Sequence, residues 1–430
     1  MQRHAFLLLV LCGANSIVIA RTSPEARADS LISLAASAPK VFINCSFCDL
    51  DYIRTEITFV NYVRDRNEAQ VDILITTQPT GGGGTEYTLT FIGQKEFAGM
   101  DDTLKYVSRP SEAQDEIRKG LVKVMKLGLI RYVARTPIAK EVSIGFTQSK
   151  AQAAVKDRWD YWVFSISENS FLSGEKSLSS SYLNGSASAR RVTKDLKVFF
   201  SGYVNYSESD FTISGQTIKS VSRGKGLNEL VAFGLGEHWS VGEIASAYSS
   251  TYGNTRLGTS LGPAVEYDIF PYSESTRRQL RILYNPSFVH NAYYEETIFG
   301  KYTDNLFKND LTVTVNIKQP WGTVSTSIEG SHYFNDFNKN RLQVFGQVSL
   351  NLFEGMSINL FGSASMIHDQ ISLPIGGATP DEILLRQKEL ATQYSYFASI
   401  GLSYTFGSIY NNIVNPRFGD QSGGGFTIIY

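Results

Sequence analysis

The sequence predicts an α+β domain followed by an all-β, antiparallel transmembrane β-barrel of about twelve strands. Three observations support this fold class. Helical and strand patterns alternate over residues 40–137. From residue 159 onward the helical pattern nearly disappears, and strand-length segments with a two-residue period follow one another. Aromatic residues make up 12% of the chain, which suits a barrel with aromatic girdles.

Composition excludes some classes of function before any motif is considered. The 430 residues carry a formal net charge of −1, which gives no electrostatic reason to expect nucleic acid or an acidic partner. The length is enough for two or three domains. Hydrophobic residues make up 42% of the chain, and their placement, more than their number, indicates the fold.

Residues 1–20 have the pattern of a secretory signal peptide. Arg3 lies in a short basic region, an apolar run follows over residues 5–11, and Val18 and Ala20 occupy positions −3 and −1 of a cleavage site. A membrane anchor is a weaker alternative because the apolar run is short and interrupted. No later stretch offers about 20 apolar residues, so no transmembrane helix is expected. The mature chain is therefore expected to leave the cytosol.

Residues 40–137 are expected to fold as a small α/β domain. A first helix is predicted where four apolar residues follow the candidate N-cap Asp49 at helical spacing. A second amphipathic helix is predicted after Ser111, which forms a capping-box pattern with Gln114. The four apolar residues of the first helix are Ile53, Ile57, Val60 and Val63. The strands are predicted at 40–44, 70–78 and 86–93, the last two forming a hairpin through the glycines at 81–84.

A polar linker (138–158) leads into a series of alternating strands. The clearest strand is DLTVTVNIK, in which Leu311 and every second residue after it are apolar, whereas the residues between are polar. A half-buried strand of a soluble protein would show the same alternation. Here the segments run to about 10 residues or more and number about twelve, which favours strands that cross a bilayer at a tilt. We therefore assign residues 159–410 to an outer-membrane barrel and residues 411–430 to a C-terminal tail.

The connections between these strands alternate in length, as they do in a membrane barrel. If the first strand, near 159–168, runs outward, every second connection should be a short inner turn. Residues 319–322 and 354–355 fit such turns, and the longer segments 209–229 and 369–393 fall on the opposite side. This parity gives an even number of strands. An antiparallel barrel requires that, and closure is needed because open strand edges are not tolerated in lipid.

Residues 380–393 carry the one helical pattern of the barrel half. Ile383, Leu384, Leu385 and Leu390 give it a short apolar stripe. We expect a surface helix in a loop, with a constriction of the lumen or a cap over its mouth as alternatives.

The last strand is predicted within residues 394–406. Its apolar side chains would face lipid, and they would carry the signal that the barrel assembly machinery recognises. A second segment, GGGFTIIY, also alternates through Phe426, Ile428 and Tyr430, but we favour the first. The expected signal residues are Ile400, Leu402, Tyr404 and Phe406.

The chain resembles a largely uncharacterised family of Gram-negative outer-membrane β-barrel proteins. The likeness lies in its end, ATQYSYFASIGLSYTFGSIYNNIVNPRFG, and in its front, CDLDYIRTEITFVNYVRD and ITTQPTGGGGTEYTLTFIG. The order strand, helix, hairpin, helix also resembles the periplasmic α/β domains of TolB and CsgG. The resemblance implies a barrel in the cell outer membrane with its N-terminal domain in the periplasm, and it brings no catalytic motif.

Cys45 and Cys48 form the sharpest local motif, a C-x-x-C between a predicted strand and a predicted helix. Thioredoxin-like proteins keep their redox pair at such a place, and a helix N-terminus would stabilise a thiolate, although Asp49 and Asp51 would oppose it. In an oxidising compartment we favour a structural disulfide or a passive pair over a redox-active pair or free thiols. No second cysteine pair completes four zinc ligands, so no metal is expected.

No other motif indicates catalysis. GTSLG (258–262) matches the G-x-S-x-G pattern, but a nucleophile elbow needs a strand that enters a helix, and Pro263 with further strand residues follows Ser260. The glycines at 81–84 lack the Lys-Ser or Lys-Thr of a phosphate loop. The sequence therefore predicts no enzyme and no cofactor. The histidines after the signal segment have no motif around them: His238, His290, His332 and His368.

Two functions remain as hypotheses. We favour an outer-membrane barrel that anchors a small periplasmic domain, which binds an unknown periplasmic partner. The alternative is a narrow channel for small solutes, because about twelve strands enclose a lumen between the filled and the wide barrels. A barrel-embedded enzyme would lack a credible set of catalytic residues. The expected partners are outer-membrane lipid and the barrel assembly machinery, with no nucleic acid.

Overall fold

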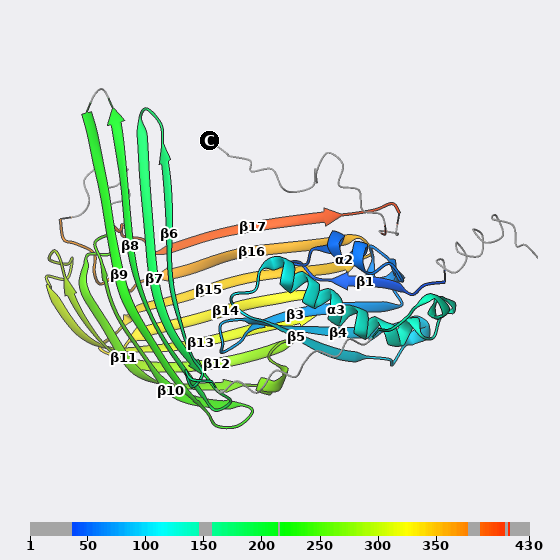
Figure 1. Ribbon diagram of the computed structural model, residues 1–430. Coiled ribbons are helices and arrows are strands. Elements are labelled where there is room, and N and C mark those ends of the chain that lie inside the picture. The colour runs from blue at the N-terminus through cyan, green and yellow to red at the C-terminus, as the bar shows by residue number, and fades with distance from the viewer. Residues whose placement is uncertain (1–36, 146–156, 214–215, 377–387, 409–411, 413–430) are drawn as a thin grey trace, which may run out of the picture.

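The computed structural model describes residues 37–145, 157–213, 216–376, 388–408 and 412, and it contains two β-sheets (Figure 1). The N-terminal sheet is mixed and has five strands, and the second sheet is antiparallel and has twelve. The predicted signal peptide, all of the predicted tail except Asn412, and most of the helical pattern at 380–393 lie outside the described residues. Within the described part of the chain, no helix is both long and apolar enough to cross a membrane.

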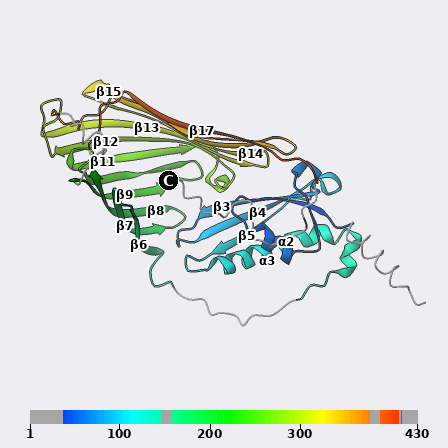
Figure 2. The same ribbon diagram turned by 90° about the horizontal axis from the view of Figure 1, so that it is seen from above.

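The α/β domain has two helices on one face of its five-stranded sheet. Its elements are β1 (Lys40–Asn44), α2 (Leu50–Glu56), β2 (Asn61–Tyr62), β3 (Val71–Pro79), β4 (Thr85–Gly93), β5 (Asp102–Ser108) and α3 (Gln114–Val133). The strand order is β2-β1-β3-β4-β5, with β1 parallel to β2 and β3 and the remaining pairs antiparallel. Figure 2 shows α2 and α3 on the face turned away from the large sheet. On that face Met125 and Leu129 of α3 are buried with Ile73 and Phe91.

The first helix is shorter than the sequence predicts. α2 ends at Glu56, and the chain turns at Ile57, whose φ and ψ are −116° and 86°. The residues that follow lead into β2, where the Tyr62 hydroxyl donates a hydrogen bond to the Ile57 carbonyl (2.9 Å). Val60 and Val63 lie beyond the helix but are buried all the same. Their helical spacing therefore reflected burial in the core and not helical structure.

The second helix begins at Gln114, whereas a cap at Ser111 would start it two residues earlier, at Glu112. Ala113 is the N-cap, and the Glu116 carboxylate accepts a hydrogen bond from the Ala113 backbone N–H (3.2 Å). The predicted cap at Ser111 is therefore wrong, although a carboxylate does satisfy a free N–H of the first turn. β5, which no helix or hairpin signal predicts, completes the sheet next to β4.

The large sheet is an up-and-down meander in which each strand pairs with its neighbours in sequence. Its strands have 11 to 19 residues. They are β6 (Trp162–Gly174), β7 (Leu178–Val192), β8 (Leu196–Ile213), β9 (Gln216–Gly234), β10 (Trp239–Ser250), β11 (Thr255–Asp268), β12 (Arg278–Tyr293), β13 (Thr303–Gln319), β14 (Gly322–Tyr333), β15 (Asp336–Phe353), β16 (Met356–Ile367) and β17 (Tyr394–Tyr404).

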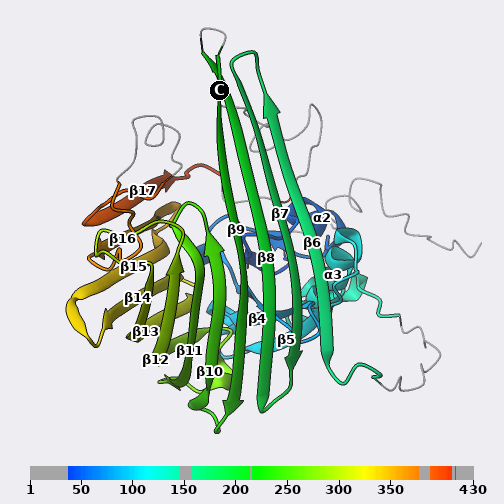
Figure 3. The ribbon, with the colours of Figure 1, turned by 90° about the vertical axis from the view of Figure 1, so that its left-hand side faces the viewer.

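The large sheet is open in this structure, so the 12-stranded antiparallel sheet is confirmed but its closure into a barrel is not. β6 pairs with β7 and β17 pairs with β16, and these two edge strands are not hydrogen-bonded to each other. The reason lies in the shape of the sheet: β6–β9 rise away from β10–β17 (Figures 1 and 3). The twist that accumulates from strand to strand thus carries one edge away from the other.

The loop predicted at 209–229 is instead the outer part of the β8–β9 hairpin. Asp210 pairs across the ribbon with Lys219, whose ammonium nitrogen lies 2.6 Å from the Glu208 carboxylate. Opposite charges on neighbouring strands stabilise an exposed ribbon. The polar composition that indicated a loop therefore belongs to a solvated pair of strands, which rises beyond the rest of the sheet in Figure 3.

The two faces of the large sheet differ in polarity along the row that crosses β10–β17 through Val313. We call the side that carries Leu311, Val313 and Val315 of β13 the apolar face, and the side that carries Thr312 and Thr314 the polar face. Starting from Val313, the cross-strand partners on the apolar face are Ile282, Tyr267 and Trp239 in one direction and Ile328, Val344, Ala364 and Tyr396 in the other.

The α/β domain is joined to one end of the large sheet, which we call the short-turn rim. This end carries the tight turns, including 320–321 and 354–355, which lie where the sequence predicts them. The Asp65 carboxylate accepts a hydrogen bond from the Gly355 N–H (2.9 Å). Beyond β17, the Asn412 side chain accepts a hydrogen bond from the Tyr62 N–H (2.5 Å). These contacts attach the domain beside β15–β17.

The tip of the β3–β4 hairpin reaches the opposite flank of the same rim. A Cβ atom at Gly81 would lie 2.7 Å from the Cβ of Val192 at the end of β7. Gly83 has a φ of +81°, which favours glycine, and a Cβ there would lie 3.3 Å from Val163 of β6. The α/β domain therefore contacts the sheet near β6–β7 as well as near β15–β17.

Asn254 ties three loops together at the opposite end of the large sheet, which we call the loop end. Its side-chain nitrogen donates to the carbonyls of Glu295 (3.1 Å) and Ser372 (2.8 Å), and its side-chain oxygen accepts from the Glu295 N–H (2.8 Å). These bonds hold residues 369–375 against the polar face. There Ile371 is buried with Val289, Leu306 and Tyr333.

Candidate binding cavity on the polar face

A cavity of about 740 Å³ opens on the polar face near the short-turn rim. It lies between β8 and β12 and includes the 3-10 turn η4 (Tyr272–Glu274). Small or apolar residues such as Ala232, Gly242 and Ile244 line one part of it. The polar side chains that line it include Lys197, Ser240, Glu266, Tyr272, Gln279 and Arg281.

Tyr272 is the centre of the polar network in this cavity. Its hydroxyl donates to a Glu266 carboxylate oxygen (3.1 Å) and lies 2.9 Å from the Ser240 hydroxyl. Ser240 and Glu266 are themselves cross-strand partners on β10 and β11, so the register brings them together. Burial raises the pKa of Tyr272 to about 12, so the phenol stays protonated and remains a hydrogen-bond donor at neutral pH.

The turn that carries Tyr272 is fixed by a fully buried aspartate. Asp268 ends β11, and one of its carboxylate oxygens accepts hydrogen bonds from the N–H groups of Phe270 (3.1 Å) and Leu280 (3.0 Å). The Glu237 carbonyl accepts from the Tyr272 N–H (2.9 Å). Backbone groups of neighbouring connections therefore position the phenol over the cavity.

Arg281 gives the cavity a second charge. Its guanidinium lies 3.7 Å from the Glu266 carboxylate, and its Nε–H is buried with no hydrogen-bond partner among the described residues. A guanidinium with a free N–H can donate a hydrogen bond to a carboxylate or another planar oxyanion. With a carboxylate and a phenol nearby, the cavity is suited to hold a small polar solute that carries both donors and acceptors.

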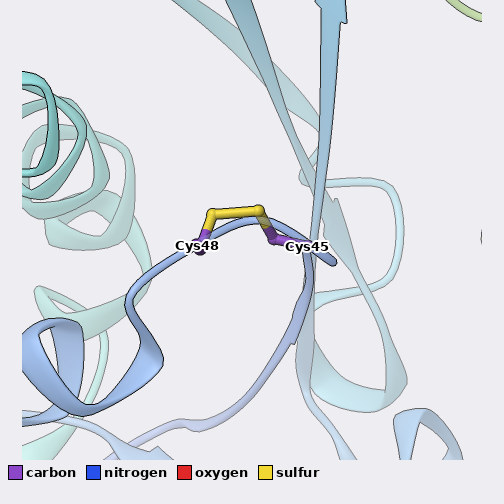
Figure 4. Close-up of a disulfide and its surroundings, with 2 residues drawn as sticks. All are labelled: Cys45 and Cys48. Carbon is purple, nitrogen blue, oxygen red and sulfur yellow. A yellow bond between two sulfur atoms is a disulfide. The ribbon is translucent and has the colours of Figure 1, made fainter. Parts of the chain in front are cut away.

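Cys45 and Cys48 lie far from this cavity in sequence, between β1 and α2, and are joined in a disulfide (Figure 4). The two acidic residues next to them are each paired with an arginine: Asp49 with Arg118 (2.9 Å) and Asp51 with Arg54 (2.8 Å). Their charges therefore oppose a thiolate less than the sequence alone implies. Phe47, between the cysteines, is 49% exposed and its ring centroid lies 5.8 Å from that of Tyr87.

The G-x-S-x-G segment lies within a continuous strand. Ser260 sits in β11, paired with Ser246 and Val289, and β11 runs on to Asp268 without entering a helix. The histidines make other contacts: His238 with the Asp268 carbonyl, His290 with Asn305, His332 with Asn309 and His368 with Asn340. Across the described ranges, no three His, Cys, Asp or Glu side chains converge as a metal site.

The predicted assembly-signal residues lie on and just after the edge strand β17. Ile400, Leu402 and Tyr404 are 73%, 65% and 59% exposed, and Phe406 follows the strand at 77%. The cross-strand partner of Leu402 is Ile358, so these side chains belong to the apolar face. The structure thus brings the candidate signal residues together but places them apart from the cavity.

The cavity itself could not be read from the sequence. Glu266 and Arg281 occupy ordinary polar positions of alternating strands, and Tyr272 follows a proline in a short connection, but nothing links the three along the chain. Only the register of β11 with β12 and the fold of η4 bring them together. No model of a protein family matches the chain, and a search among curated proteins gives no match either.

Proposed function

We propose that this protein is an outer-membrane β-barrel protein that anchors its α/β domain at the periplasmic mouth. The observation that carries the proposal is the apolar face, which continues across the strands of the large sheet with many exposed large side chains. An exposed apolar surface that extends over several strands is expected to be covered by an apolar solvent or by a partner. Lipid tails would solvate it, whereas water would not.

In this proposal the barrel closes when β6 pairs with β17. Lipid offers no hydrogen bonds to the free N–H and C=O groups of an open edge, so two unpaired edges would be costly in a bilayer. The even strand number makes β6 and β17 antiparallel, as a closed meander requires. The α/β domain contacts the sheet on both sides of this seam and would hold the two edges near each other.

Cysteine pairs test the closure directly. Ser167 on the polar face of β6 is replaced by Cys together with one serine of β17, in three separate variants: Ser395→Cys, Ser399→Cys or Ser403→Cys. In membranes we expect one of these pairs to cross-link efficiently and the others poorly, because a closed sheet has one register. The protein should also need detergent for extraction and migrate differently before and after heating. A chain that stays in the soluble fraction, with no cross-link in any variant, would contradict the proposal.

The anchored domain is proposed to bind a periplasmic partner that is still to be identified. A pull-down with the detergent-solubilised full chain, compared with a chain lacking residues 40–137, would test this. Partners that are retained equally by both chains would argue against a role for the domain.

A narrow channel for small solutes is the second candidate function, and the polar cavity favours it. Its charged and hydroxyl groups lie on the face that a closed barrel would turn toward its lumen. Conductance steps in planar bilayers that change in size when Arg281 is replaced by Gln would support it. If planar bilayers that contain the inserted protein show no conductance steps, only the anchoring function is supported.

A further inference from the structure

A groove runs along β7 on the apolar face of the large sheet. Two adjoining hollows of about 550 and 1110 Å³ make it up. They share one cross-strand row, in which Ala187 of β7 is the floor. The apolar face of β7 carries only small residues in this region, namely Gly185, Ala187 and Ala189. The shared row is Ile166, Ala187, Gly202, Leu227 and Ala247.

Larger side chains on the flanking strands form the walls of the groove. Phe164 and Ile166 of β6 stand on one side, and Phe200 and Val204 of β8 on the other. Because these strands are already paired with one another, the floor and walls do not depend on the free edge of β6. The length of β7 that is covered, about five residues at about 3.3 Å each, matches several methylene units of an extended chain.

The charges along the groove are distributed unevenly. Glu229 lies in the part nearer the short-turn rim, and Lys225 and Arg256 lie toward the loop end. No carboxylate lies within ion-pair distance of Lys225 or Arg256 in the described ranges, whereas Lys219 on the same strand is paired with Glu208. Two cations without partners at one end of an apolar groove favour an anionic group there.

Two further polar side chains lie near the same end. The His290 ring uses one nitrogen to bond Asn305 (2.7 Å), which leaves the other nitrogen for a ligand. Glu168 also lines this end, and its carboxylate accepts a hydrogen bond from the Ser170 hydroxyl. The balance of formal charge at this end remains positive, with two cations against one carboxylate.

We propose that this groove binds one acyl chain of a phosphorylated membrane lipid, with the lipid phosphate at Lys225 and Arg256. The inference rests on the proposed function, since it requires the apolar face to lie in a bilayer. The small residues of β7 accept the chain, the apolar walls bury it, and the gradient of charge fixes its direction. Glu229 at the other end disfavours the reversed orientation.

The test measures how much lipid stays with the purified full chain. Protein in a neutral detergent is exposed to dioleoyl phosphatidylglycerol or dioleoyl phosphatidylcholine, which have the same chains, and retained lipid is counted by native mass spectrometry. At low salt we expect the anionic lipid to be preferred by about 25-fold, because each cation near a lipid phosphate contributes about fivefold. The double variant Lys225→Ala/Arg256→Ala should lose this preference, and Lys219→Ala, the paired lysine of the same strand, should keep it.

A second variant separates the acyl chain from the phosphate. Ala187→Trp fills the floor of the groove and should lower retention of both lipids, whereas Ala364→Trp, on the apolar face of β16, should not. Equal retention of the two lipids by the unaltered chain, or an unchanged preference in the double variant, would overturn the proposal. So would displacement of the bound lipid by excess inorganic phosphate alone, which would indicate a simple anion site.

The failure of this inference can be told apart from the failure of the proposed function. Membrane association and the need for detergent are measured on the same variants. A soluble chain would overturn both proposals, whereas a membrane-bound chain without lipid selectivity would overturn only the groove.

Discussion

Asp72 is a buried carboxyl group whose oxygens have no hydrogen-bond partner. It lies on β3 with a side chain that is 0% exposed, and both of its oxygens are unsatisfied among the described residues. Burial raises its pKa to about 7, and the charge of Arg66 opposes this only in part. Thr76 and Thr88, also buried, place further polar groups on the same sheet face. Asp72 is adjacent on β3 to Ile73, which packs against the helices, so Asp72 lies on the opposite face of the sheet. Figure 2 shows the face opposite the helices turned toward the large sheet.

This raised pKa predicts that the α/β domain loses stability as the pH rises. The folded domain keeps the proton on Asp72 up to about pH 7, whereas the unfolded chain releases it near pH 4, so the folded state binds more protons in between. We expect the free energy of opening of β3 to fall by about 2–3 kcal/mol from pH 5 to pH 8. Hydrogen exchange of β3 peptides in the full chain measures it. Asp72→Asn should flatten the pH dependence, and an equally steep dependence in that variant would rule out Asp72 as its cause.

The Asn254 side chain holds the loops of the loop end together by hydrogen bonds. It is buried, its three hydrogen bonds reach two other loops, and its φ of +50° is a conformation that asparagine and glycine tolerate. Asn254→Ala should cost about 2–4 kcal/mol because buried partners lose their bonds and alanine is strained there. Asn254→Gly should cost less, since it removes the bonds but not the conformation. Protease cleavage of residues 369–375 is the readout, and equal cleavage of the two variants would contradict the role of backbone strain.

At the scale of elements, carboxylates interrupt the apolar face on several strands. Glu229 and Glu243 share that face with Val231 of β9 and Val265 of β11, as the register of β10 shows. If lipid covers the face, replacing a carboxylate by leucine removes an unfavourable charge. We expect Glu243→Leu to raise the free energy of unfolding in micelles by about 1–2 kcal/mol.

The matched control for this prediction is the same change on the other face. Glu329 of β14 pairs with Thr312 and therefore lies on the polar face. Glu329→Leu should give no gain in stability. Equal effects of the two substitutions on denaturant midpoints would mean that the faces do not differ in their surroundings.

Alternation and turn composition predict single elements well, because both are local properties. The two-residue period located β13 and β17, and short turn segments located the connections at 320–321 and 354–355. The same signals failed in two places. The polar outer half of the β8–β9 hairpin is predicted as a loop. The charge pairs that stabilise it join residues on two different strands, and a local sequence pattern does not show such pairs. Val60 and Val63 fit a helical period, since burial of an extended segment can mimic it.

At the scale of the whole molecule, the α/β domain is held at both flanks of the short-turn rim. A Cβ at Gly81 would lie 2.7 Å from the Cβ of Val192, which is closer than the roughly 3.5–4.5 Å of a disulfide. We therefore expect the variant Gly81→Cys/Val192→Cys to form a disulfide under mild oxidation after the hairpin tip moves back by about 1 Å. Gel mobility without reductant reports it. The control Gly81→Cys/Val198→Cys moves the partner to the apolar face of β8 and should not cross-link. Equal cross-linking of the two pairs would contradict a fixed position of the domain.

The arrangement of the whole molecule was the least predictable from sequence. The sequence predicts an antiparallel series of strands but not how far twist separates its first and last members, because twist is a sum over all the strands. It predicts the glycines at 81–84 as a hairpin tip but not their contact with β6 and β7. The cavity around Tyr272 likewise depends on three strands and a turn that are brought together only by the fold.

The neighbour-to-neighbour pairing of the large sheet has a consequence for how the chain reaches this shape. Its paired strands follow one another along the chain, so hairpins can form one after another and each step closes only a short connection. The meeting of β6 with β17 would be the exception, because it joins segments more than half the chain apart. Hairpin formation should therefore be fast and the pairing of β6 with β17 slow. A factor that brings these two strands together would then determine the rate at which the closed barrel forms.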